Sequence, residues 1–167
     1  MHNKVVFATA EAFFSLGCEV LRFNFRGVGL STGSHDFGKG EVEDALAAVD
    51  FLRSRHPETP CHLAGFSFGA GIALQTACRD VSLASVTAVA PSFKFSDPGC
   101  LSSLSTPKLL LQGTADTLCP ADDLRRLYPG FLSPKSVVWF EGVEHFFAGK
   151  IDVLKASIVE HRQFLGL

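Results

Sequence analysis

The order of apolar and polar positions predicts helices that alternate with short strands. An apolar stripe with helical spacing between Val6 and Gly17 predicts a first helix, and Asn3 is placed to cap its start. The next segment, EVLRFNF at 19–25, alternates between apolar and polar residues, so we expect a strand followed by a glycine-rich loop. Residues 41–55 return to helical spacing, with acidic residues early and arginines late, as the helix dipole favours.

The rest of the chain repeats this alternation. Short apolar runs predict strands at residues 61–66, 86–90, 108–112 and 136–140. Segments with helical spacing follow the strands at 61–66 and 108–112, and a last helix is predicted from Ile151 onward. Uninterrupted apolar runs of this length are typical of a buried parallel sheet. The pattern therefore predicts an α/β protein, a three-layer α/β/α sandwich with a mostly parallel sheet.

Length and charge narrow the classes of function. The chain has 167 residues and is 47% hydrophobic, enough to bury one core, so we expect a single domain over residues 1–167. The net charge is −2 and the basic residues are scattered, which argues against nucleic acid or an anionic membrane as a partner. No apolar run reaches the ~20 residues that a membrane helix needs. We expect a monomer or a homodimer.

The cysteines indicate a compartment. There are five of them, an odd number with no Cys-x-x-Cys pair: Cys18, Cys61, Cys78, Cys100 and Cys119. This spacing fits neither a disulfide scaffold nor a zinc ribbon. A reducing, cytoplasmic location is therefore expected, and no metal site is predicted.

A candidate nucleophile stands between a predicted strand and a predicted helix. The sequence GFSFG at 65–69 matches G-x-S-x-G. It lies directly between a strand and a helix, which is the context in which this motif exposes a nucleophilic serine. A serine hydroxyl is a weak nucleophile unless a sharp turn exposes it and a base takes its proton. Ser67 is therefore the candidate nucleophile. The alternative is that GFSFG is only a turn of small residues between strand and helix, with no catalytic role. A second match places Ser31 inside a loop with no helix after it, so we interpret Ser31 as a turn residue.

An activated serine needs a histidine and a carboxylate that orients it. Asp116 and His145 each follow a predicted strand by four or five residues. Because the carboxyl ends of parallel strands meet at one edge of a sheet, we expect both side chains to lie near Ser67. Glu141 and Glu144 are the alternatives to Asp116 for the orienting carboxylate.

The motifs GFSFG, QGTAD and GVEHFF, together with NFRGVGLSTGSHDFGKGEVEDALAAVDFL, resemble a bacterial α/β-hydrolase of the small, lidless, dienelactone-hydrolase-like kind over nearly the whole chain. The resemblance implies Ser67 as nucleophile, Asp116 as the acid and His145 as the general base. It also implies that the backbone N–H of Phe68 forms half of the oxyanion hole and that no cofactor is needed. Arg26 lies in a loop that borders the site in this fold, where it is usually structural; it is a candidate for substrate contact.

Aromatic residues near the predicted site favour an apolar acyl or alkyl group in the substrate. The candidates for lining the pocket are Phe66, Phe93, Phe95 and Phe146. Each of them could equally fill the core. The connection at 91–107 is too short for a helical cap, so the pocket is expected to be open. Cys119 is interpreted as buried packing because the elbow carries a serine.

The start of the chain departs from the family pattern. Members of this fold begin with two or three strands, and the loop before their first helix supplies the second oxyanion donor. By the family's strand order, the missing third strand would lie between the predicted strands at 19–25 and 61–66. Either Met1 is an internal methionine of a longer natural chain, or the protein lacks these strands. Loss of one oxyanion donor lowers turnover by about 10²- to 10³-fold.

These observations support three hypotheses. The first is a serine hydrolase that cleaves a small-molecule carboxylic ester through an acyl-enzyme on Ser67. The second is a catalytically impaired or non-catalytic α/β-hydrolase-like module with an incomplete oxyanion hole. The third is a thioesterase, peptidase or acyltransferase on the same fold, which the predicted catalytic residues do not distinguish because all of these reactions use acyl chemistry.

Overall fold

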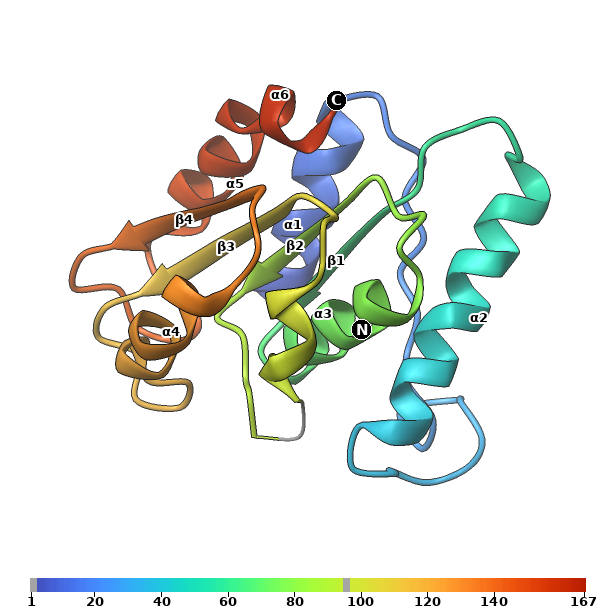
Figure 1. Cartoon of the computed structure of the whole chain (residues 1–167), viewed down its shortest axis with the longest axis horizontal. Helices are drawn as coiled ribbons and strands as arrows, with labels where there is room; N and C mark the ends of the chain where they lie inside the picture. Colours follow the sequence, from blue (N-terminus) through green and yellow to red (C-terminus); the bar gives the residue numbers. More distant parts are fainter. Residues whose placement is uncertain (1–2, 95–96) are drawn as a thin grey trace.

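The computed structural model describes residues 3–94 and 97–167 and contains a four-stranded parallel sheet with helices on both faces (Figure 1). The strands are β1 (His62–Phe66), β2 (Ser85–Val89), β3 (Lys108–Gly113) and β4 (Lys135–Phe140). They lie side by side in the order of the sequence, and each pairs in parallel with the next. The four strands predicted from the apolar runs are therefore confirmed.

Helices cover the sheet in two layers. They are α1 (Lys4–Ser15), α2 (Lys39–Arg55), α3 (Phe68–Arg79), α4 (Ala121–Leu127), α5 (Ile151–Glu160) and α6 (Arg162–Leu165), with 3-10 turns η1 (Pro98–Ser102) and η2 (Tyr128–Gly130). Helices α1, α5 and α6 share one core with the sheet. Helices α3 and α4 share the core on the opposite face, and α2 packs against α3. This arrangement is the predicted α/β/α sandwich.

Alternate residues of the inner strands supply the two cores. Leu109 and Leu111 belong to the cluster beneath α1 and α5, whereas Leu110 belongs to the cluster beneath α3. Every residue of β2 and β3 is buried. Both faces of these strands are covered, which explains why their sequences are continuous apolar runs rather than alternating ones.

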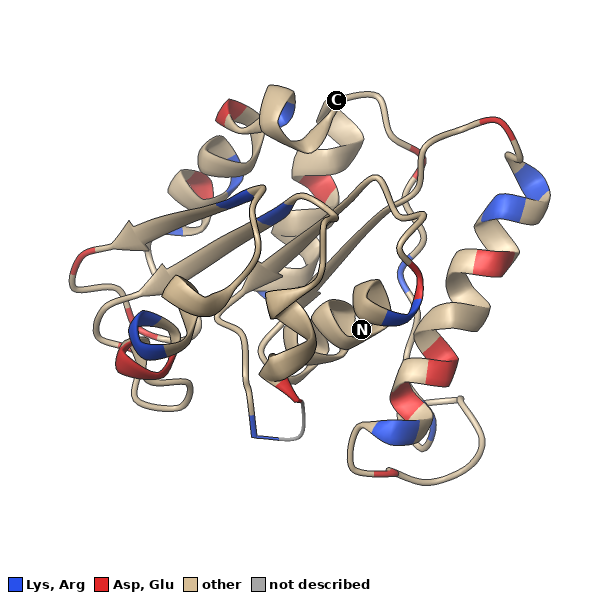
Figure 2. Ribbon diagram, in the orientation of Figure 1, with Lys and Arg blue, Asp and Glu red and all other residues tan. Residues whose placement is uncertain are grey.

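Local signals set the ends of the first two helices. The side-chain oxygen of Asn3 accepts hydrogen bonds from the N–H groups of Val5 (2.9 Å) and Val6 (3.2 Å), which confirms the predicted cap of α1. The first turn of α2 carries the acidic Glu41, and its last turn carries Arg53 and Arg55; Figure 2 shows the basic residues at this end of the helix. Figure 2 also shows acidic and basic residues interspersed over the helices. No helix of the described ranges is long and apolar enough to cross a membrane.

Residues 19–25 are extended coil, so the strand predicted there is wrong. In the view of Figure 1 this segment runs between β1 and α2. Among the described residues no backbone hydrogen bond joins it to β1, and β1 is the edge of the sheet. A strand exists only beside a hydrogen-bonded neighbour. Alternation of apolar and polar residues shows only that the two faces of a segment differ in burial. It does not show that another strand lies beside the segment.

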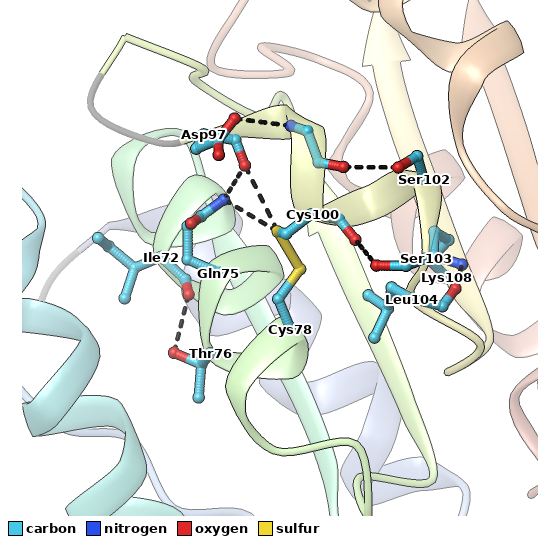
Figure 3. Close-up of a disulfide and its surroundings, with 11 residues drawn as sticks. Ile72, Gln75, Thr76, Cys78, Asp97, Cys100, Ser102, Ser103, Leu104 and Lys108 are labelled. Carbon is cyan, nitrogen blue, oxygen red and sulfur yellow. Dashed lines mark hydrogen bonds between the residues drawn. A yellow bond between two sulfur atoms is a disulfide. The ribbon is translucent and has the colours of Figure 1, made fainter.

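A disulfide joins Cys78 in α3 to Cys100 in η1, which the wide cysteine spacing did not predict (Figure 3). The two Cα atoms are 6.1 Å apart across a sequence separation of 22. The pair meets because the connection between β2 and β3 folds back onto α3, where Gln75 Nε2 donates to the carbonyl of Asp97. The sequence predicted a reducing, cytoplasmic compartment on the argument that the cysteines are unpaired. The disulfide removes that argument.

Lys108 is a buried cation at the start of β3. Its Nζ donates to the carbonyl oxygens of Leu104 and Leu132, both at 2.8 Å, and of Pro134 at 3.3 Å. No part of the side chain is exposed. Burial, with a smaller contribution from the nearby charge of Lys135, lowers the pKa of Lys108 to about 8.

This pKa predicts a dependence of stability on pH. An unfolded lysine has a pKa of about 10.4, so between about pH 8 and that value the unfolded chain binds more protons than the folded one. The contribution of Lys108 to the free energy of unfolding therefore rises as the pH increases through this window. We expect the difference in unfolding free energy between wild type and Lys108→Met, from urea denaturation, to shift in favour of wild type over that range. A difference that does not change with pH would contradict the shifted pKa.

Candidate active site

Ser67 occupies a sharp turn between β1 and α3. Its φ of 55° and ψ of −118° lie outside the regions that residues with a Cβ prefer. The turn depends on a close approach of two backbones, because a Cβ at Gly65 would lie 2.1 Å from the carbonyl oxygen of Gly69. Gly69 itself has more room, since its nearest neighbour would be Phe25 Cε2 at 3.7 Å. Position 65 therefore requires a glycine. The resulting tight turn places Ser67 at the carboxyl end of β1.

Ser67, His145 and Asp116, together referred to below as the triad, form one chain of hydrogen bonds. His145 Nε2 lies 3.0 Å from Ser67 Oγ, and His145 Nδ1 lies 2.7 Å from Asp116 Oδ2. The histidine and the aspartate are each only 5% exposed. With the proton of the imidazole on Nδ1 and donated to Asp116, Nε2 is free to accept the hydroxyl proton of Ser67.

The loops that carry His145 and Asp116 are held close together. The first follows β4 and the second follows β3. A Cβ at Gly113 would lie 2.2 Å from the carbonyl oxygen of Val143, so the close approach of these loops requires a glycine at the end of β3. The predicted convergence of three strand ends is thus achieved by short backbone contacts.

The carboxylate of Asp116 accepts four hydrogen bonds. Oδ1 accepts from the N–H groups of Leu118 (2.9 Å) and Cys119 (2.8 Å). Oδ2 accepts from His145 and from Gln112 Nε2, the latter at 3.2 Å. These donors fix the plane of the carboxylate and keep Oδ2 directed at the imidazole.

Gln112 is a site residue that the sequence analysis treated only as part of a strand. It is 1% exposed, and its Nε2 also donates to the carbonyl oxygens of Gly113 and Cys119, both at 3.1 Å. The side chain therefore ties β3 to the loop that carries Asp116. A polar residue at the end of the apolar run KLLLQ was the signal that could have identified it, because buried polar groups need partners.

Cys119 lies beside the nucleophile. Its Sγ is 3.9 Å from Ser67 Oγ, and the residue is buried. Burial raises the pKa of the Cys119 thiol, which keeps it protonated and poorly reactive near neutral pH. The expected packing role agrees with this environment. No cluster of metal-ligating side chains occurs within the described residues.

Two of the four candidate pocket phenylalanines lie against the triad. The ring centroids of Phe66 and Phe146 are 4.8 Å and 5.0 Å from that of His145, and Phe146 is 53% exposed. Phe93 instead packs against Phe131, 6.3 Å between centroids, in the core beneath α3. Phe95 falls outside the residues that the structure describes. The apolar surface next to the triad therefore comes from Phe66 and Phe146.

Phe68 begins α3, directly after Ser67. This position places its backbone N–H at the positive end of the helix dipole, where a developing negative charge is stabilised. The alternatives to Asp116 lie elsewhere: Glu141 and Glu144 are exposed, and both ring nitrogens of His145 face Ser67 and Asp116.

Arg26 holds the glycine-rich loop to α2. Its Nε and Nη2 donate to the carboxylate of Asp44, the Nη2 bond being 2.8 Å, and its backbone N–H donates to the same group at 2.9 Å. A Cβ at Gly40 would lie 1.9 Å from Arg26 Nη1, so the guanidinium lies against the helix backbone. Ser31 Oγ donates to the carbonyl of Asn24, which agrees with its interpretation as a turn residue. No hydrogen bond within the described ranges joins Arg26 to the triad.

A family model and two solved structures that are similar to this chain carry descriptions as serine enzymes. A family model described as serine aminopeptidase, S33, matches residues 1–100. A solved α/β serine hydrolase homologue from Coxiella burnetii is 36% identical, has a TM-score of 0.89, and is matched over 96% of this chain and 77% of that one. An α/β serine hydrolase without a lid from Xanthomonas campestris is 33% identical, with a TM-score of 0.89 over 98% of this chain and 74% of that one.

A relative of similar identity has no described activity. An uncharacterized protein of Rickettsia prowazekii is 35% identical over 170 residues, which span 96% of this chain and 71% of the relative. Each of these relatives therefore has chain length beyond the matched part. The family and the fold agree with the resemblance found in the sequence.

The close approach at the elbow predicts that two neighbouring glycines respond differently to substitution. Gly65→Ala drives a methyl group into the backbone of α3, and we expect the free energy of unfolding to fall by about 3 kcal/mol or more. Gly69→Ala, the matched control, has space for the methyl group and a helical backbone, so stability should be unchanged or slightly raised. Urea denaturation of both variants tests this. Equal losses would show that the contact at Gly65 does not determine the turn.

Proposed function

Because this chain belongs to the serine aminopeptidase S33 family of α/β hydrolases, we propose that it cleaves carboxylic esters through an acyl-enzyme on Ser67. The observation that carries the proposal is the placement of His145 between the other two triad members, 3.0 Å from Ser67 Oγ and 2.7 Å from Asp116 Oδ2. These separations are within hydrogen-bond reach, as proton transfer from a serine requires.

The reaction proceeds in two halves. His145 Nε2 takes the proton of Ser67 Oγ while the oxygen attacks the carbonyl carbon of the ester. The imidazolium then gives that proton to the leaving alcohol, which departs and leaves an acyl group on Ser67. In the second half a water molecule loses its proton to His145, attacks the acyl carbon and releases the carboxylic acid. Asp116 holds the Nδ1 proton throughout and stabilises the imidazolium.

The negative charge of the tetrahedral intermediate develops at the start of α3. The backbone N–H of Phe68 is our proposed donor to this oxyanion, and the dipole of α3 acts in the same direction. The strained turn at Ser67 supports this role because it projects the nucleophile at the first turn of the helix, with no reorganisation needed during the reaction.

The surroundings of His145 favour an uncharged substrate. Phe66 and Phe146 present aromatic surface to the imidazole, and Phe146 is half exposed. An apolar acyl or alkyl group placed here would be removed from water by these two rings. We therefore propose esters with an apolar group close to the scissile bond as the preferred class.

Peptide hydrolysis is the second candidate, and the description of the matched family as serine aminopeptidase favours it. The same triad can protonate an amine leaving group instead of an alcohol. A panel of p-nitrophenyl esters and amino-acid p-nitroanilides separates the two candidates. Higher kcat/KM for the esters supports our proposal, and higher values for the anilides support the peptidase.

Labelling with a fluorophosphonate tests the nucleophile. We expect intact-mass analysis of the wild type to show one adduct and peptide mapping to place it on Ser67. Ser67→Ala should take up no label and lose ester turnover by roughly 10³-fold or more. Ser31→Ala is the matched control, because Ser31 is the other serine with the same motif and donates to a backbone carbonyl, so this variant should be labelled like wild type.

Two outcomes would contradict the proposal. Full turnover in Ser67→Ala would exclude Ser67 as the nucleophile. The absence of an adduct in wild-type protein that is folded by circular dichroism would favour the non-catalytic module.

The contacts of Gln112 predict a positioning role. Gln112→Met keeps the length of the side chain and removes the donor to Asp116 Oδ2, so the carboxylate is held less firmly against His145. We expect kcat for a p-nitrophenyl ester to fall by ~10- to 100-fold with KM little changed, because misplaced catalytic groups affect the chemical step. The free energy of unfolding, measured in parallel, separates this effect from a general loss of folding. Unchanged kcat in a folded variant would remove the role.

A further inference from the structure

The two sides of the nucleophile have different surroundings. On the side of α1 and α5 lie the rings of Phe66 and Phe146, whose centroids are 4.8 Å and 5.0 Å from that of the His145 imidazole. Phe66 belongs to the core that these helices share with the sheet. The ring of Phe146 lies 6.1 Å from that of Phe66 and is half exposed. Aromatic surface therefore meets the solvent directly beside the imidazole.

The side of α3 and α4 presents smaller and more polar groups. Cys119 lies just ahead of α4, and its Sγ is 3.9 Å from Ser67 Oγ. The same thiol lies close to the side chain of Ser92, whose backbone N–H donates to the carbonyl of Ser67 at 3.1 Å. The residue after Ser92, Phe93, packs into the core beneath α3. A thiol and a hydroxyl therefore border the nucleophile on this side.

Cys119 is firmly held beside Ser67. Its backbone N–H donates to Asp116 Oδ1 at 2.8 Å, and its carbonyl accepts from Gln112 Nε2 at 3.1 Å. The residue is only 8% exposed. Burial raises the pKa of the thiol, so the group is uncharged near neutral pH. Cys119 is thus a fixed, neutral wall that cannot move aside for a bulky group without breaking these contacts.

The chemistry of ester cleavage determines how a substrate lies between the two sides. The tetrahedral carbon carries Ser67 Oγ, the oxyanion, the leaving oxygen and the acyl chain. The oxyanion lies at the N–H of Phe68 in the mechanism proposed above. The leaving oxygen must come within hydrogen-bond reach of His145 Nε2, which gives it a proton. The acyl chain takes the remaining direction, where Cys119 is a second side chain in contact with Ser67 Oγ.

Resting on the ester hydrolysis proposed above, we propose that Phe146 and Cys119 decide which half of the substrate is apolar and large. The alcohol half lies against Phe146, where a half-exposed ring gives an apolar group both contact area and open space. The acyl half is short, because the buried Cys119 limits the space beside Ser67. The preferred substrates are therefore short-chain acyl esters of apolar alcohols.

A pair of isomeric esters tests this assignment. Benzyl acetate has a short acyl group and an apolar alcohol, and methyl phenylacetate has the same atoms with the ester reversed. Dividing each kcat/KM by the rate of alkaline hydrolysis of the same ester removes the difference in intrinsic reactivity. We expect the wild type, followed by titration of the released acid, to prefer benzyl acetate by ~10-fold or more.

Phe146→Ala removes the surface assigned to the alcohol. We expect its preference for benzyl acetate over methyl phenylacetate to fall by ~10-fold. The preference is a ratio within one protein, so it does not depend on how much of the variant is folded. Phe51→Ala is the matched control: Phe51 is 47% exposed, close to the 53% of Phe146, but lies in α2 against Arg55. This variant should keep the wild-type preference.

Cys119→Ala enlarges the space assigned to the acyl group. We expect kcat/KM for methyl phenylacetate to rise by ~10-fold relative to that for benzyl acetate. Cys61→Ala is the matched control, because Cys61 is a free cysteine ahead of β1, at the opposite end of that strand from Ser67. Its preference should equal that of the wild type.

The contrary outcomes are distinct. Equal rates for the two esters, or faster hydrolysis of methyl phenylacetate by the wild type, would overturn the assignment of the two halves. An unchanged preference in Phe146→Ala or in Cys119→Ala would remove the role of that residue. Hydrolysis of neither ester, by protein whose Ser67 takes up the fluorophosphonate, would contradict ester hydrolysis itself and the assignment with it.

Discussion

The close approach of β1 to the first turn of α3 is the contact on which the rest of the structure depends. No atom larger than hydrogen fits between Gly65 and the carbonyl oxygen of Gly69. Helix and strand can therefore meet at van der Waals distance, and the chain must reverse within one residue, Ser67, at a positive φ. Helix α3 starts from that turn, forms the core on one face of the sheet and carries the cysteine that anchors η1.

The candidate active site follows from the parallel order of the strands. Parallel strands bring their carboxyl ends to one edge, so residues from three separate loops meet there without long connections. Their positions are then secured by groups that do no chemistry themselves. Gly113 allows two loops to touch, and Gln112 shares the carboxylate of Asp116 with His145. The reactive residues are few, whereas the residues that orient them are distributed along β3 and its loop.

Among the described residues β1 is the edge strand of the sheet, and a cavity lies beside it. The resemblance in the sequence placed a missing strand between the segments at 19–25 and 61–66, and the cavity beside β1 lies at that position. Alternation along 19–25 was a correct sign of two unlike faces, but it could not show whether a neighbouring strand was present. The neighbours of β1 are therefore set by how the strands assemble and not by any local pattern.

The sequence by itself determined most of the helices, the four strands of the sheet and the order of Ser67, Asp116 and His145, because hydrophobic period and motif context act over a few residues. Only the tertiary structure decided that Cys78 meets Cys100, that Gln112 reaches Asp116, and that residues 19–25 stay unpaired. The roles of Phe93 and Arg26 were likewise decided by contacts with Phe131 and Asp44. These features depend on partners far away along the chain, and local patterns carry no information about which distant residues become neighbours.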